Sequence, residues 1–334
     1  MAAVQRADGG IPWYRGHHLD PWDHVEAAMA LDSAGAHERA AAAYRWLANR
    51  QNPDGSWYAA YADDGPGRPT DRGRESNFCA YPAVGVLHHY LATGDDAFRR
   101  GMWPHVRAAV EYVLTLQRPG GELGWRRDAD GTASDGALLT GCSSAYQALR
   151  CALALAEAQR DPQPEWELAV GRLGHALRDH PERFLDKSHY SMDWYYPVLA
   201  GVVRGPAATA RLAGRWDDFV VPGLGAHCVL PNRWVTGGES AELALALWVA
   251  GQPRRAAEVL GWLGHLRAPD GLYWTGYVYA DDTVWPRERT TWTAGSVLLA
   301  AAALTGHRPT RAVFDPTALP RGLDRDPARD CCPA

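Results

Sequence analysis

The chain of 334 residues contains a single lysine, Lys187, so its basic residues are almost all arginine. Its formal net charge of -5 argues against a nucleic-acid-binding surface, which requires a basic face. No apolar run reaches the roughly 18 residues of a membrane span, and no basic segment followed by an apolar one indicates a secretion signal. The sequence therefore predicts a cytoplasmic protein with no transmembrane segment and no nucleic-acid partner.

Motifs of several common enzyme classes are also missing. None of the six cysteines forms a Cys-x-x-Cys pair, and in a cytosolic chain we expect them to stay reduced. No Walker loop, no G-x-G-x-x-G after a strand and no G-x-S-x-G occurs, so nucleotide-binding and serine-hydrolase functions lack support. The segment His17–His24 is dense in histidine and aspartate, but its spacing matches no metal-binding template such as H-E-x-x-H. We therefore predict no metal site.

Helical segments of two kinds are plentiful. The first kind is apolar on nearly every face, which is typical of buried helices; it comprises residues 20–35, 74–94, 134–158, 191–205, 236–251 and 287–306. The second kind is amphipathic and rich in Arg or Glu, which is typical of surface helices; it comprises residues 36–51, 95–117, 165–184, 206–221 and 252–267. The two kinds alternate along the chain at near-regular intervals.

Helix pairs that recur in this way stack on their neighbours and can close into a ring. Six pairs with a buried inner layer predict an all-α fold, an (α/α)6 toroid, as a single domain over residues 1–310. The Pro-rich residues 311–334 are expected to form an irregular tail. The outer partner of the sixth buried helix should be short or irregular.

A similar turn joins an outer helix to the next inner helix three times, within Arg50–Trp57, Leu116–Trp125 and Leu266–Trp274. Such turns lie at one rim of an α/α toroid, so we expect the aromatic side chains near them to wall a central cavity. The alternative is that a rim tryptophan merely covers a helix end. The predicted substrate-binding residues are Trp57, Tyr61, Trp125, Trp194, Tyr195, Trp274, Tyr277, Trp292, His24 and Asp23.

Each buried helix starts with an acidic residue. Acids are favoured in the first turn because they complement the helix dipole, and Asp23 and Glu239 fit capping patterns. The aromatic neighbours of Asp193 should raise its pKa, which suits a general acid. Arginines beside Glu75 and Glu288 should keep these two carboxylates ionised, and Asp135 follows a long loop that could act as a lid. The candidate catalytic residues are Asp193, Glu75, Glu288 and Asp135.

The segment "RQNPDGSW" at Arg50–Trp57 resembles the Q-x-x-x-G-x-W repeat of squalene–hopene cyclases. With the alternating helices over residues 10–305, the chain is similar to the terpenoid cyclase/protein prenyltransferase toroids, and to short actinobacterial proteins labelled prenyltransferases. The resemblance implies an isoprenoid-processing enzyme that works through a carbocation. The D-x-D-D acid of the cyclases is absent, and the only Asp-x-Cys pair, Asp330 and Cys332, has no histidine after it. No catalytic residue of these families can therefore be carried over.

Three functions stay open. The first is a prenyltransferase- or cyclase-like enzyme with Asp193 as the acid. The second is a carbohydrate-active enzyme of the glycoside hydrolase type with paired carboxylates. The 15 Trp and 14 Tyr against 5 Phe favour it, because Trp and Tyr combine a stacking face with a hydrogen-bonding group. The third is a non-catalytic toroid that binds a partner. We rank the isoprenoid function first on the resemblance alone, with a small-molecule substrate, no required cofactor, and Mg²⁺ only if that substrate is a diphosphate.

Overall fold

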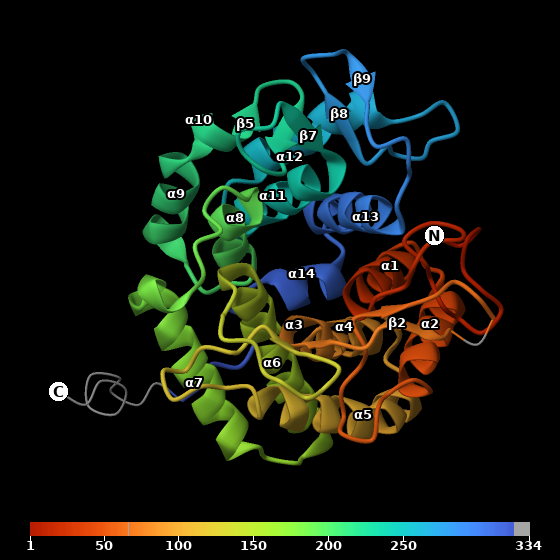
Figure 1. Ribbon diagram of the computed structural model, residues 1–334, viewed down its shortest axis with the longest axis vertical. Helices are drawn as coiled ribbons and strands as arrows, with labels where there is room; N and C mark the ends of the chain where they lie inside the picture. The colour runs from red at the N-terminus through yellow and green to blue at the C-terminus, as the bar shows by residue number, and fades with distance from the viewer. Residues whose placement is uncertain (66, 324–334) are drawn as a thin grey trace.

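The computed structural model describes residues 1–65 and 67–323, and most of them lie in helices. An inner ring is formed by α1 (Pro21–Ser33), α3 (Ser76–Ala80) with α4 (Pro82–Thr93), α6 (Leu139–Gln159), α8 (Ser191–Leu199), α11 (Gly237–Val249) and α13 (Thr291–Thr305). Each of these helices packs on the next, and α13 packs on α1, so the ring closes (Figure 1). These are the segments that the sequence predicted to be buried.

The outer helices surround this ring (Figure 1). They are α2 (His37–Ala48), α5 (Asp96–Leu114), α7 (Pro164–Asp179), α9 (Gly205–Gly214) and α12 (Pro253–Trp262). Each packs on the inner helix that precedes it in the chain. Helix α5 shows why, since Met102, Val106, Ala109 and Val113 fall on one face at helical spacing and are buried there. No helix in the described part of the chain is long and apolar enough to span a bilayer.

Helix α14 (Arg308–Phe314) follows the sixth inner helix but takes no place in the outer layer (Figure 1). It packs on α4, α13 and α1. The hydroxyl of Thr310 lies 3.0 Å from Ser33 Oγ and 3.0 Å from His88 Nε2, and Gln147 Nε2 donates to Val313 O at 2.8 Å. The helix therefore closes the end of the ring at which the inner helices finish. The domain boundary predicted at residue 310 stays a prediction, and residues 324–334 of the predicted tail lie outside the described residues.

Short strands mean that the all-α class is not confirmed. Two sheets are two-stranded, β1 (Ala60–Tyr61) with β2 (Pro69–Asp71) and β3 (Arg74–Glu75) with β4 (Arg126–Arg127). A third sheet is antiparallel in the order β5 (Val220–Val221), β6 (Gly225–His227), β7 (Trp234–Thr236), β8 (Gly276–Val278) and β9 (Thr283–Val284). Short helical turns complete the fold: α10 (Trp216–Phe219), η1 (Pro181–Arg183) and η2 (Leu263–Leu266). Strands of two or three residues are too short to show alternation, so the sequence carried little sign of them.

Candidate active site

The first turn of α1 carries two acidic side chains. Asp20 caps the helix, because its Oδ1 accepts the N–H of Asp23 at 2.9 Å, and Pro21 follows it at the first helical position. Asp20 Oδ2 lies 3.4 Å from His18 Nε2. Burial and then the neighbouring charge of Asp20 raise the pKa of Asp23 well above its ordinary value. Asp23 is thus the member of this pair whose protonated form is favoured.

Helix α11 carries two further buried acids, Glu239 and Glu242. The capping box expected between Thr236 and Glu239 does not form, because the Thr236 side chain makes no cap hydrogen bond. Within the described residues, Glu239 Oε2 and Glu242 Oε1 have no hydrogen-bond partner. Tyr195 on α8 donates its hydroxyl to the other oxygen of Glu242. Glu239 is therefore free of the capping role that the sequence suggested.

Glu26 of α1 interacts electrostatically with acids of both helices, Asp20 and Glu242. Its carboxylate accepts hydrogen bonds from Trp22 Nε1, Tyr81 Oη and Ser296 Oγ at 3.1 Å each. Burial raises the pKa of Glu26 to about 7 despite these donors. Burial, followed by the charge of Glu26, also raises the pKa of Glu242. We call these five side chains the acidic cluster: Asp20, Asp23, Glu26, Glu239 and Glu242.

Partly exposed aromatic side chains lie beside the acidic cluster. Trp13 stacks on Trp292 with the ring centres 5.8 Å apart, and on His18 at 5.9 Å. Trp13 Nε1 also donates to Glu288 Oε1 at 3.4 Å. A Cβ atom on Gly238 would lie 2.5 Å from the Trp292 ring, so only glycine lets this tryptophan lie against the first turn of α11. Trp292 therefore lies against the first turn of α11, which carries Glu239, and Trp13 stacks between Trp292 and His18.

One group in the described part of the chain has the spacing of metal ligands. His18, Asp20 and Asp23 each offer an atom within 4.8 Å of the others. Asp20 already accepts the Asp23 N–H and pairs with His18, so the group is satisfied by its own contacts. The expectation that the protein uses no metal stays a prediction.

Two predicted catalytic residues lie in different places, Asp193 buried and Glu75 half-buried. Asp193 lies in the first turn of α8 and accepts the Thr140 hydroxyl at 2.6 Å. Burial raises the pKa of Asp193, as its aromatic neighbours suggested, but the residue lines a separate cavity of about 580 Å³. Glu75 lies 3.7 Å from Arg126 Nη1, and burial outweighs this cation, so the pKa of Glu75 rises to about 7. Burial thus opposes the ionised form of Glu75, which the sequence expected neighbouring arginines to favour.

The other two predicted catalytic residues, Asp135 and Glu288, lie outside the helices on which the sequence placed them. Helix α6 begins at Leu139 and α13 at Thr291, so Asp135 and Glu288 both belong to the preceding loops. Asp135 is exposed. Glu288 is half-buried and contacts Trp13, which stacks on Trp292 and His18 beside the acidic cluster.

Some of the predicted substrate-binding residues lie at the acidic cluster and the others lie elsewhere. The structure brings Asp23, Tyr195 and Trp292 to the acidic cluster, as described above. Trp57 Nε1 instead donates to Leu47 O at 2.8 Å and covers the end of α2. His24 uses both ring nitrogens on the backbone, accepting from Ile11 N at 3.1 Å and contacting Ala43 O at 2.9 Å. Neither side chain has a polar side-chain atom left to bind a substrate.

The remaining aromatic candidates make contacts elsewhere. Tyr61 pairs through its backbone with Leu19 and so fixes the segment that leads to Asp20. Trp194 stacks on Phe219 at 5.3 Å. Trp125 and Trp274 lie under the guanidinium groups of Arg126 and Arg289, and Tyr277 donates to Asp282.

Sequence reasoning missed or set aside several residues of this site, namely Asp20, Glu26, Glu239, Glu242, Trp13 and Tyr81. A usable signal was present in the helices apolar on all faces. Such a helix offers no solvated face, so an acid in its interior must be buried and needs partners or a function. Glu26 and Glu242, each three residues after the first-turn acid of its helix, fit this description.

Comparison with known proteins shows the family to which the chain belongs. No protein-family model matches the chain. The chain is 52% identical over 324 residues to the MMP endo-(1,4)-3-O-methyl-alpha-D-mannosidase of Mycolicibacterium hassiacum, covering 97% of this chain and 89% of that protein. Among solved structures, a wild-type glycosidase superposes with a TM-score of 0.69 at 17% identity, over 91% of this chain and 94% of the other. A GH63 mannosylglycerate hydrolase from Thermus thermophilus gives 0.65 at 14% identity, over 89% and 97%. These two structures share the fold.

These findings overturn the resemblance to terpenoid cyclases and prenyltransferases, and with it the isoprenoid function. The Q-x-x-x-G-x-W segment pointed to the wrong family because its role is structural and does not depend on the reaction. Gln51 Nε2 donates to Gly55 O within the turn and to His105 O on α5, at 2.8 Å each. This arrangement fastens two helical hairpins together whatever the substrate. The carbohydrate-active alternative is supported instead: the protein is an enzyme of the glycosidase type, and the chain belongs to the family of the MMP endo-(1,4)-3-O-methyl-alpha-D-mannosidase.

Proposed function

We propose that the protein is an endo-acting glycoside hydrolase that cleaves α-(1,4) linkages between 3-O-methyl-D-mannose units. The observation that carries the proposal is the acidic cluster, which sets carboxyl groups of α1 and α11 beside stacked tryptophans. The name of the relative from Mycolicibacterium hassiacum supplies the sugar and the linkage, and 52% identity supports the transfer.

Asp23 is the proposed general acid. Glycoside hydrolysis needs one carboxyl group that gives a proton to the departing oxygen. The raised pKa of Asp23 keeps this proton available near neutral pH, and the charge of Asp20 contributes to the shift. Asp23 also keeps partial solvent exposure, so a substrate oxygen can reach it.

Glu239 is the proposed second carboxylate. Its Oε2 has no hydrogen-bond partner among the described residues, so it can act on water or on the anomeric carbon. The faces of Trp13 and Trp292 would stack on sugar rings at either side of the cleaved bond. We place Glu288, which contacts Trp13, among the groups that touch the polysaccharide.

The reaction needs no cofactor in this scheme, because two carboxyl groups suffice for it. We therefore expect activity to survive removal of divalent cations by a chelator. The Mg²⁺ considered for a diphosphate substrate has no part in this proposal.

The test uses the purified protein with a 3-O-methylmannose polysaccharide and an unmethylated α-(1,4)-mannan, with products followed by mass spectrometry. We expect internal cleavage of the methylated polymer. Asp23→Asn and Glu239→Gln should each lower kcat by about 100-fold or more, because each removes one of the two reacting groups.

Asp135→Asn is the matched control, since Asp135 is exposed, and Asp193→Asn tests the acid that the sequence favoured. Both should retain activity. Full activity in Asp23→Asn together with a loss in Asp193→Asn would move the active site to the cavity beside α8. No cleavage of either polymer by the wild-type protein would refute the proposal.

A further inference from the structure

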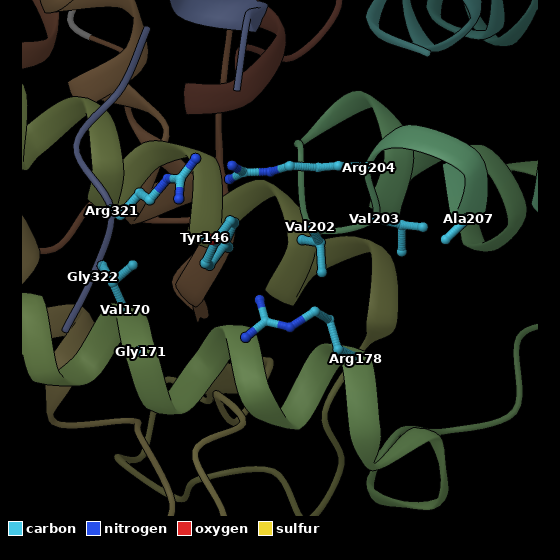
Figure 2. Close-up of a pocket in the computed structure, with 10 residues that line it drawn as sticks. All are labelled: Tyr146, Val170, Gly171, Arg178, Val202, Val203, Arg204, Ala207, Arg321 and Gly322. Atoms are coloured by element: carbon cyan, nitrogen blue, oxygen red, sulfur yellow. The ribbon is translucent and has the colours of Figure 1, made fainter. Parts of the chain in front are cut away.

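A cavity of about 600 Å³ opens on the outer wall of the toroid, between α7 and the turn that joins α8 to α9 (Figure 2). It shares no residue with the acidic cluster and plays no part in the proposed hydrolysis. Its lining consists of Tyr146, Val170, Gly171, Arg178, Val202, Val203, Arg204, Ala207, Arg321 and Gly322.

Among the described residues of this lining, the charged ones are all arginines. Figure 2 shows the guanidinium groups of Arg204 and Arg321 pointing toward each other above Tyr146, with that of Arg178 on the other side of the ring. No carboxylate is among the lining residues, and no ion pair engages Arg204 or Arg321 within the described part of the chain. The like charges of Arg204 and Arg321 repel each other, and an anion between these two guanidinium groups would remove the repulsion.

A fourth arginine, Arg150, lies next to this group and is fully buried. Its guanidinium stands 5.6 Å from the centre of the Tyr146 ring. Nε donates to Pro320 O at 2.8 Å and Nη2 to Pro316 O at 2.6 Å, whereas Nη1 has no partner among the described residues. Burial lowers the pKa of Arg150, and the charges of Arg204 and Arg321 lower it further. A buried cation with an unused donor is the kind of group that a bound anion satisfies.

The wall that carries Arg321 is held in place by close backbone packing. Leu323 N donates to Glu167 O at 3.1 Å. A Cβ atom on Gly322 would lie 2.7 Å from Gly171 N, so glycine lets this segment press against α7. Together with the bonds from Arg150, these contacts fix the position from which Arg321 reaches over the cavity.

We propose that this cavity binds a phosphorylated small molecule, with its phosphate held by Arg204 and Arg321. Guanidinium groups match phosphate oxygens in pairs of parallel hydrogen bonds, which favours phosphate over a single carboxylate where several arginines meet. The valines and the Tyr146 ring offer an apolar wall for the organic part of the ligand. The site shares no residue with the acidic cluster, so this ligand would bind without occupying the hydrolytic site.

The test is calorimetric titration of the full chain with inorganic pyrophosphate and with glucose 6-phosphate, at an ionic strength fixed with sodium chloride. We expect saturable binding, and a rise in Tm of roughly 5 °C when the ligand is at 100 times its Kd. Tighter binding of the sugar phosphate than of pyrophosphate is expected if the apolar wall contributes.

The double variant Arg204→Gln/Arg321→Gln should raise Kd by about 10-fold or more, because it removes two charge-assisted contacts. Arg172→Gln, an exposed arginine on the same helix as Arg178, is the matched control and should bind like the wild type. Ala207→Trp leaves the charges unchanged and should block the exposed edge of the cavity, so it guards against a misfolded double variant. Binding as tight as that of the wild type in both the double variant and Ala207→Trp, or no saturable binding of the wild type up to millimolar ligand, would overturn the proposal.

Discussion

Glu26 ties the stability of this protein to pH through a single buried carboxyl group. Burial raises the pKa of Glu26 from 4.5 to about 7 in the folded state. Below the lower value both the folded and the unfolded chain hold the proton, and the contribution to stability is fully present. Between the two values only the folded chain holds it, so the free energy of unfolding falls as pH rises, by about 3 kcal/mol in total.

Glu26→Gln should remove this dependence, because glutamine keeps the shape of the protonated acid and has no proton to lose. We expect the variant to lose less unfolding free energy than the wild type between about pH 5 and pH 8. Urea denaturation at several pH values measures it. Glu38→Gln on the exposed face of α2 serves as the control and should follow the wild type. Parallel curves for Glu26→Gln and the wild type would show that Glu26 is ionised in the folded protein.

Two acids of α1 show why the site could be predicted only in part at this scale. Glu26 and Asp32 are both buried in a helix apolar on every face. Asp32 is neutralised structurally, since His89 Nδ1 and His37 Nδ1 lie 2.9 Å and 3.0 Å from Oδ1. Glu26 instead meets Tyr81, from α3–α4, and the acids of α11. Asp32 contacts histidines and Glu26 lies near other acids because different helices pack against them. Those helices are distant in the chain, so the sequence alone does not show which acid has which neighbours.

At the scale of elements, the turns before the inner helices were predicted well, because their chemistry is local. Gly55, Gly121 and Gly271 all have positive φ, at 88°, 97° and 84°. Glutamines 51 and 117 each bond the backbone of their own turn and of the next outer helix. The starts of α6 and α13 were predicted too early, because a polar or acidic residue in the loop mimics a first turn. The start of a helix depends on how the preceding loop or strand packs against other elements. This packing is not a local property, so the starts of α6 and α13 could not be read from the adjacent residues.

Gly55→Ala should destabilise the protein by roughly 3 kcal/mol, through an unfavourable backbone conformation and a steric clash. The added Cβ would lie 2.1 Å from Ala108 O on α5, which cannot move without shifting that helix. Gly94→Ala is the matched control, since Gly94 also has positive φ but nothing lies within 4 Å of its added Cβ. We expect it to cost only about 1 kcal/mol, the conformational part alone. Equal losses in Tm for the two variants would show that the turn is not held against α5.

For the whole molecule, closure of the ring is the property that creates the site. Helices α1 and α13 lie far apart in the chain, and their packing places Trp292 beside Trp13 and Ser296 against Glu26. The alternation of buried and amphipathic segments predicted the ring. It did not predict that α14 would cross its end, because a short Pro-rich segment after the last inner helix resembles a tail.

Substitution of Phe314 tests whether α14 is part of the domain or belongs to a tail that begins after residue 310. Its side chain is buried with Val313 and Leu319 in the main core, whereas Arg308 on the same helix is exposed. Phe314→Ala should lower the free energy of unfolding by about 3 to 5 kcal/mol, the cost of removing a large buried side chain. Arg308→Ala should change it by less than about 0.5 kcal/mol. A loss below about 1 kcal/mol for Phe314→Ala, measured by urea denaturation, would place the end of the domain at residue 310, because a core side chain cannot be removed so cheaply. The larger loss, in a single cooperative transition, would mean that the ring and the helix closing its end unfold as one unit.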